Sequence, residues 1–260
     1  MTIVQGISCS TCGAPLHLNP GEIISTCRYC GYTQVVQTGK AFTFEHSMLL
    51  NKFTTQGKGR EGASKPDIEK TVLQWMSTGF TKPSDLARGS NILERKLVYL
   101  PFWVIDINVE TSYKGVFERL QPPVVKNGQI KKHYDWLILA RKASEFPVRE
   151  YDVPLEGKIP FDFRKIEDYA EVLNSELERG DAMEKAEEEI TTLHAFHAKQ
   201  DVDKVLEIKT AFNHKEAVYL HSPIWFITYE YKGKEYKVTV DAAEGAVITG
   251  DLPQVKLGLL

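Results

Sequence analysis

The four cysteines of this chain carry its clearest chemistry, because they form two Cys-x-x-Cys-Gly knuckles separated by fourteen residues. A tight turn of this kind aims two thiolates at one ion, and the glycine after it lets backbone amides point at the sulfurs. The spacing predicts a zinc ribbon holding one structural zinc ion, since four thiolates leave no position for water or substrate. A redox dithiol and an iron site use the same ligands and remain alternatives. The predicted ligands are Cys9, Cys12, Cys27 and Cys30.

The tip of the second knuckle holds Arg28 and Tyr29. An arginine can pair with phosphate, and a tyrosine can stack on a base or enter a protein groove. These two residues are therefore predicted to contact a partner. The alternative is that Tyr29 and Tyr32 only cover the metal site.

A basic segment offers a second predicted contact surface. Residues 113–150 carry eight Lys and Arg against four Asp and Glu, and Tyr134 and Trp136 lie among them. Such a segment can follow a nucleic-acid backbone while an aromatic ring stacks on an exposed base. The alternative is an edge strand whose lysines prevent aggregation. The residues predicted to bind the partner here are Lys126, Lys131, Lys132 and Arg141.

Other patterns that suggest sites are weaker. Gly57, Gly59 and Gly62 have the spacing of a dinucleotide fingerprint, but no clear strand precedes them and Pro66 delays the helix, so a flexible basic linker is expected. The sequence contains no nucleophile elbow, no phosphate loop and no His-Glu-x-x-His. We therefore expect no enzyme and no small-molecule substrate.

Two histidines raise the question of a second metal site. His194 and His197 share a helical face, and Asp201 follows one turn later. Against a carboxylate-histidine site, Ile190 and Thr191 occupy the preceding turn, where a Glu-x-x-His motif requires a glutamate.

The elements that must position these residues follow from periodicity and an internal repeat. Residues 92–115 and 205–233 share Val-Tyr-Leu, Pro-x-Trp and Tyr-Lys-Gly, so two related antiparallel β units are predicted, with turns at Lys-Gly, Asn127-Gly128 and Glu244-Gly245. A helix is expected over residues 66–78. Two acidic helices, one from 166 with its apolar stripe to 177 and its end at Gly180, the other from 181, form a predicted helical hairpin. Trp103 and Trp225 are expected in the core.

The predicted fold class is α+β, an N-terminal zinc ribbon followed by two related antiparallel β units separated by a helical hairpin. The expected divisions are a ribbon over 1–46, a basic glycine-rich loop and helix over 47–90, the first β unit with its basic hairpin over 91–160, the acidic helical hairpin over 161–204 and the second β unit over 205–260.

Composition sets the expected compartment. The longest apolar run, "LVYLPFWVIDI", is interrupted by Pro101 and Asp106, and the N-terminus lacks a basic region followed by an apolar signal core. We expect a cytoplasmic protein with no membrane partner, where thiols stay reduced and bind metal.

The ribbon, the two Pro-x-Trp units, "IPFDFRKIEDYAEVL" and the closing "GAVITGDLP" together resemble a group of prokaryotic, largely archaeal zinc-ribbon proteins. Their ribbon is similar to that of transcription initiation factor B, and the overall plan is similar to archaeal ribosome-dormancy factors that hold small subunits in dimers. The resemblance implies a non-catalytic adaptor on a nucleoprotein assembly, the ribosome ahead of the transcription apparatus, with a homodimer as a further expectation. A protein-protein scaffold is the alternative, and an enzyme with a cleft between the β units is a third.

Overall fold

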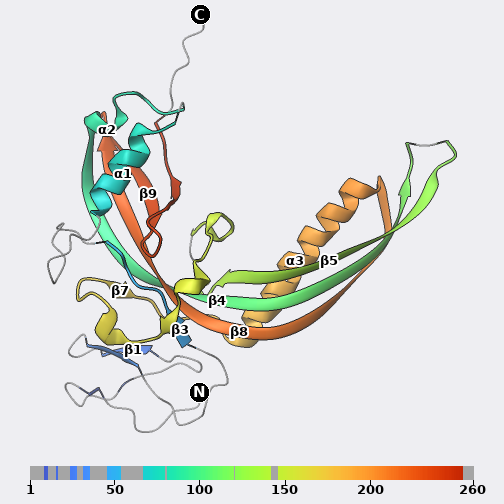
Figure 1. Ribbon diagram of the computed structural model, residues 1–260, viewed down its shortest axis with the longest axis horizontal. Helices are drawn as coiled ribbons and strands as arrows, with labels where there is room; N and C mark the ends of the chain where they lie inside the picture. The colour runs from blue at the N-terminus through green and yellow to red at the C-terminus, as the bar shows by residue number, and fades with distance from the viewer. Residues whose placement is uncertain are drawn as a thin grey trace, which may run out of the picture.

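Two strands of 28 residues, β4 (Ser90–Phe117) and β8 (Lys204–Tyr231), form the frame of the molecule. The computed structural model describes residues 9–10, 16, 24–27, 32–35, 46–53, 67–79, 81–119, 121–141 and 146–253. The two strands pair antiparallel over nearly their whole length, and Figure 1 shows the pair bent into one long curve. The sequence favours this pairing because both strands are rich in β-branched and aromatic residues.

Shorter strands extend this pair into a mixed sheet. β5 (Val124–Leu139) pairs with the second half of β4, and β9 (Lys234–Asp241) pairs with the second half of β8. β10 (Val247–Gly250) continues beyond β9. Three very short strands pair near the middle of the sheet: β3 (His46–Met48) beside β8, β6 (Ile159–Pro160) beside β3, and β7 (Glu171–Val172) beside β4. A separate hairpin joins β1 (Ile24–Thr26) to β2 (Thr33–Val35).

A helix precedes each long strand in the sequence, and these helices pack on the same face of the sheet. α1 (Ile68–Ser77) and the short α2 (Leu86–Gly89) precede β4, and α3 (Arg179–Asp201) precedes β8. α1 buries Ile68, Val72 and Met76 against odd-numbered residues of both strands, including Leu97 and Trp225. α3 buries Ala182, Ala186 and Ile190, with the same four-residue spacing, against Trp103, Ile105 and Tyr219. Among the described residues, no helix is long and apolar enough to cross a membrane.

The sequence repeat therefore corresponds to an approximate two-fold axis through the sheet. Trp103 of β4 lies opposite Tyr219 of β8, and Trp225 of β8 lies opposite Leu97 of β4. α1, which precedes β4, packs on the second half of β8, and α3, which precedes β8, packs on the second half of β4. Each long strand is followed along the chain by a strand that pairs antiparallel with its second half, β5 after β4 and β9 after β8. The α+β class is confirmed, but the two β units form one sheet.

Among the residues that the structure describes, those that cover the opposite face of the sheet lie near its centre. Its buried residues include Val98, Leu100 and Phe102 of β4, which pack with Phe146 and Tyr151. These two aromatic residues come from the segment that contains η1 (Val148–Glu150) and η2 (Leu155–Gly157). Beyond this cover, the strands β5, β4 and β8 continue as a three-stranded extension that we call the arm, composed of β5 with residues 105–117 of β4 and residues 204–217 of β8.

The predicted helical hairpin is wrong in its first helix. Residues 166–177 contain β7, bends and extended chain, after η3 (Phe163–Lys165). Ile166, Leu173 and Leu177 pack in three different core clusters, so their helical spacing does not reflect one buried stripe. The second helix is confirmed and is longer than expected, as α3.

Two predicted turns are also wrong, whereas two are confirmed. The Lys232-Gly233 turn joins β8 to β9 with positive φ at both residues, and Gly245 has a positive φ at the β9 to β10 turn. In contrast, Lys114-Gly115 continues strand β4, and Asn127-Gly128 lies inside β5 opposite Lys114 and Tyr113. At Gly128 the glycine serves close packing, because the Tyr113 ring occupies the space of a β-carbon.

Candidate functional site

The described part of the N-terminal segment has features of the predicted ribbon. β1 and β2 pair from Ile24 and Val35 to Thr26 and Thr33, and the Cys27 amide donates to the Tyr32 carbonyl at 2.8 Å, closing a loop at the second knuckle. The Ser10 amide and hydroxyl both donate to the side-chain carbonyl of Gln34 on β2, at 2.6 and 3.0 Å. The segment of the first knuckle is thereby tied to the hairpin that leads into the second.

Two of the four predicted ligands can be placed. Cys9 and Cys27 are buried, with 2% and 1% of their surface exposed, as thiolates inside a closed metal site must be. Cys12 and Cys30 lie outside the described residues, as do Arg28 and Tyr29 at the knuckle tip. Tyr32 is 47% exposed. The donor set and this burial fit a structural zinc ion.

Three of the four basic residues predicted to bind a partner in the segment 113–150 have acidic partners within the chain. Lys126 pairs with Asp201 at the end of α3, and the Lys131 ammonium lies 3.0 Å from a Glu110 oxygen. Arg141 lies 2.9 Å from Glu176, and its guanidinium also donates to the Asn174 carbonyl at 3.1 Å. Lys132 is on the helix side of the sheet, where its ammonium lies 5.0 Å from the centre of the Tyr134 ring.

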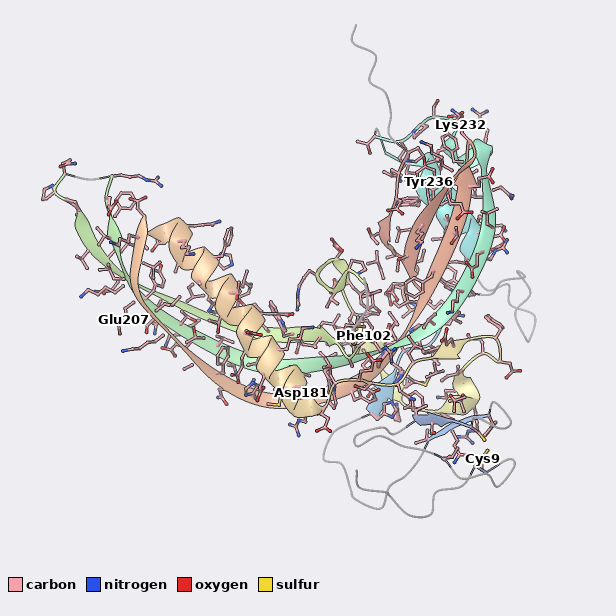
Figure 2. The ribbon with its side chains drawn as sticks, turned by 180° about the vertical axis from the view of Figure 1, so that it is seen from behind. Cys9, Phe102, Asp181, Glu207, Lys232 and Tyr236 are labelled. Atoms are coloured by element: carbon pink, nitrogen blue, oxygen red, sulfur yellow. The ribbon has the colours of Figure 1, made fainter. Side chains whose placement is uncertain are left out.

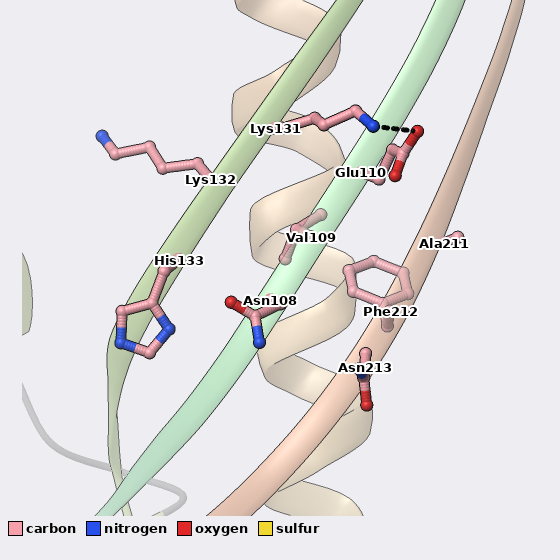
Figure 3. Close-up of a pocket in the computed structure, with 9 residues that line it drawn as sticks. All are labelled: Asn108, Val109, Glu110, Lys131, Lys132, His133, Ala211, Phe212 and Asn213. Carbon is pink, nitrogen blue, oxygen red and sulfur yellow. Dashed lines mark ion pairs between the residues drawn. The ribbon is translucent and has the colours of Figure 1, made fainter.

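The face of the arm that points away from α3, here called the outer face, is exposed and polar. Ile107 and Val109 of β4 point towards α3, so the alternating Asp106, Asn108 and Glu110 point away from it. Figure 3 shows a shallow groove on this face, with α3 behind the strands. The residues that line the groove, of which Val109, Lys132 and Phe212 direct their side chains to the helix side of the sheet, are Asn108, Val109, Glu110, Lys131, Lys132, His133, Ala211, Phe212 and Asn213.

The outer face carries charges of both signs, with carboxylates in excess. Besides the Lys131 to Glu110 pair, Lys209 lies 2.6 Å from Glu207 and His133 lies 3.4 Å from Asp106. Asp106 is directly opposite Asp135 on β5 and Glu216 on β8, so three carboxylates form a row across the arm. A surface of mixed sign offers hydrogen-bonding and ion-pairing groups to another protein, and it attracts a polyphosphate chain weakly.

His194 belongs to a buried network between α3 and the arm. Its Nδ1 lies 2.7 Å from the Thr111 hydroxyl and its Nε2 lies 2.8 Å from the Tyr134 hydroxyl, while Thr111 also bonds Thr210 at 2.9 Å. Burial lowers the pKa of His194. Both ring nitrogens are thus engaged. Asp201 bonds Tyr113 and Lys126 instead, so these contacts give no support to a metal site at His194, His197 and Asp201.

Sequence reasoning missed a histidine pair in the centre of the molecule. His46 on β3 and His221 on β8 lie 3.0 Å apart between Nε2 and Nδ1, and His221 Nε2 lies 2.9 Å from the Leu173 carbonyl. That carbonyl accepts from His221, so His221 Nδ1 accepts from His46. Burial lowers the pKa of His221 to about 4, and burial together with the His221 charge lowers the pKa of His46 to about 2. No motif could signal this pair, because 175 residues separate its members.

A second buried network lies at the turn between β9 and β10. The Tyr151 hydroxyl bonds the Ser222 hydroxyl, and Asp241 accepts from the amides of Ala243 and Glu244 at 2.8 and 3.2 Å. Burial raises the pKa of both Tyr151 and Asp241. Because Asp241 is engaged in closing the turn, this serine, tyrosine and aspartate group is structural in character.

Comparison of the chain with protein-family models, with curated proteins and with solved structures finds no match.

Proposed function

We propose that this protein is a non-catalytic zinc-ribbon adaptor that docks on a nucleoprotein assembly, the ribosome ahead of the transcription apparatus, and that its arm contacts protein there. The observation that carries the proposal is the outer face of the arm. This face presents a shallow groove with charges of both signs on a sheet that α3 covers from behind. Rigid polar surfaces of this kind suit protein recognition, in which complementary charges set register more than affinity.

Pairing of the basic residues supports protein over phosphate as the partner of the arm. Lys126, Lys131 and Arg141 already have carboxylate partners, so binding phosphate would require breaking those ion pairs. The net gain from counterion release would then be small. This differs from the expectation that these lysines follow a nucleic-acid backbone.

The ribbon supports the assembly side of the proposal. The β1 and β2 ladder, the Cys27 to Tyr32 hydrogen bond and the buried Cys9 and Cys27 are consistent with a zinc ribbon. The resemblance of that ribbon to the one in transcription initiation factor B favours a role on a nucleoprotein machine. In this proposal the ribbon tip, with Arg28 and Tyr29, makes the second contact.

The test is sedimentation of the tagged protein from native lysate through a sucrose gradient, at low and high salt, with and without ribonuclease. Co-migration with a ribosomal subunit that persists at high salt supports docking through protein. Affinity that falls steeply and linearly in log K against log salt would assign the contact to phosphate, whereas a protein contact between complementary charges weakens less steeply. Migration as a free species in every condition would favour the alternative of a protein scaffold outside such assemblies.

Variants locate the contact. Asn108→Arg with Asn213→Arg, two residues that face each other in the groove, should abolish co-migration while far-UV circular dichroism stays unchanged. The matched control is Glu235→Arg, an exposed change on β9 at the other end of the sheet. Replacing Arg28 and Tyr29 together by alanine should weaken binding without loss of zinc. Unchanged binding in the groove variant would remove the arm from the interface.

A further inference from the structure

The outer edge of β5 is a long strand edge with a self-complementary order of side chains. β5 has 16 residues, and within the described part of the chain its backbone pairs with β4 alone. Figure 1 shows β5 running along one border of the arm, and Figure 2 shows the same border from behind. Arg149 of η1 lies 4.1 Å from the centre of the Trp136 ring, near the C-terminal end of β5. The remainder of the edge exposes unpaired amides and carbonyls that readily pair with another strand.

One carboxylate on this edge, that of Asp135, has no basic partner among the described residues of the same copy. Asp135 lies directly opposite Asp106, which lies opposite Glu216, and like charges facing each other across strands are destabilising. Among the described residues, Asp135 makes no ion pair with a lysine or arginine. Lys131 lies four residues away on the same face of β5, where its partner is Glu110.

We propose that the β5 edge pairs with the β5 edge of a second copy of this chain, antiparallel and with a two-fold axis at His133. In this register Lys131 lies opposite Asp135 of the second copy, and the pair occurs twice. On the helix side, Ile130 lies opposite Trp136 and Lys132 lies opposite Tyr134, which are pairs of aromatic and aliphatic or cationic side chains. Registers centred on Lys131 or Asp135 instead place equal charges opposite each other.

An exposed aromatic residue on α3 flanks the same edge. Glu189 accepts a hydrogen bond from the Trp136 indole of β5 at 2.9 Å, so this flank of α3 faces β5. Phe196 follows Glu189 by two helical turns, and 57% of its surface is exposed. In the dimer, the second copy extends the sheet beneath this ring. Because like edges pair with like, the assembly closes as a dimer and does not continue as a filament.

Sedimentation equilibrium of the full zinc-loaded chain in reducing buffer tests the dimer. The wild type should be dimeric, and both Lys131→Asp and Asp135→Lys should be monomeric, since each places like charges at the two paired positions. An equimolar mixture of the two variants should recover a dimer, because one chain is then acidic at both positions and the other chain is basic at both. The double variant K131D/D135K should also dimerise, since it exchanges the two charges and keeps every pair opposite in sign.

Lys209→Asp is the matched control, since it removes an exposed lysine and its ion pair with Glu207 on the same face but away from the β5 edge. This control should remain dimeric. Circular dichroism of each variant establishes that it is folded.

The proposal is overturned if the wild type is monomeric at about 100 µM, a concentration at which a pairing interface with a Kd up to this range would be detected. It is equally overturned if both single variants stay dimeric or if their mixture stays monomeric. The result does not depend on the proposed docking function, because the experiment contains no other partner.

Discussion

The Tyr113 ring fills the space that a β-carbon at Gly128 would occupy. Tyr113 is on β4 and Gly128 is opposite it on β5, and the Tyr113 hydroxyl donates to Asp201 at 2.6 Å. Lys126 pairs with the same carboxylate. One aromatic side chain therefore links both strands near the end of the arm to the last residue of α3.

Gly128→Ala should consequently loosen the arm. The new methyl group overlaps the Tyr113 ring, and moving the ring breaks its hydrogen bond with Asp201. We expect a loss of about 1–3 kcal/mol in the free energy of unfolding, measured by urea denaturation. Gly180→Ala is the control, since nothing lies within 4 Å of the added atom, and it should be neutral or stabilising by up to about 1 kcal/mol. Equal stability of the two variants would contradict this packing.

The tripeptide Tyr-Lys-Gly, which occurs in both halves of the sequence repeat, shows what can be predicted from sequence and what cannot. Tyr231-Lys232-Gly233 turns as predicted, whereas Tyr113-Lys114-Gly115 runs straight on in β4. The difference arises outside the tripeptide, because at Gly115 the chain passes against Val202 after α3 and then pairs with β5. Local propensity permits both conformations, and tertiary packing selects one.

Thr111→Val should destabilise the arm by removing the hydroxyl that joins His194 to Thr210. The shape of the side chain is kept, so the loss comes from the unsatisfied His194 nitrogen, about 1–3 kcal/mol. Thr210→Val removes a more peripheral hydroxyl and should have a smaller effect. A double-mutant cycle of the two changes should give a non-zero coupling energy, and strict additivity would show that the hydroxyls do not act as one network.

Replacing Cys27 and Cys30 by serine should release zinc and unfold the ribbon. The zinc ion supplies folding free energy to a segment too small to bury a core, so the loss should be confined to that segment. Metal analysis should show a fall from one zinc per chain to none, while the long β4 and β8 pair keeps its circular dichroism signal. Retained zinc stoichiometry would refute ligation by four thiolates.

The ribbon ligands stay a prediction from sequence, which rests on a local motif with fixed spacing. That Lys126, Lys131 and Arg141 have acidic partners could not be predicted, since Asp201, Glu110 and Glu176 reach them only in the folded chain. The helix over residues 66–78 could be predicted because its signals are local. Its apolar spacing is intact, and Asp67 caps it by accepting from the Glu69 amide at 3.0 Å.

Stability should fall as the pH is lowered from about 7 towards 5, because of the pair His46 and His221. Their ordinary pKa is 6.5, and in the folded chain the pKa is lowered to about 2 for His46 and about 4 for His221. Below 6.5 the unfolded chain binds protons that the folded chain does not, so each group lowers the unfolding free energy by up to about 1.4 kcal/mol per pH unit until its folded pKa is reached. Above 6.5 both states hold neutral imidazoles and the effect vanishes.

Urea unfolding at closely spaced pH values measures this slope. The double variant H46Q/H221Q keeps hydrogen-bonding groups at both positions and removes the titration, so its slope should be shallower than that of the wild type. His197→Gln, a change at an exposed position on α3, should leave the slope unchanged. A double variant with the wild-type slope would mean that the pair is already protonated, or is accessible to water, in the folded chain. Such accessibility would contradict the complete burial of His221 between β3 and the Leu173 carbonyl.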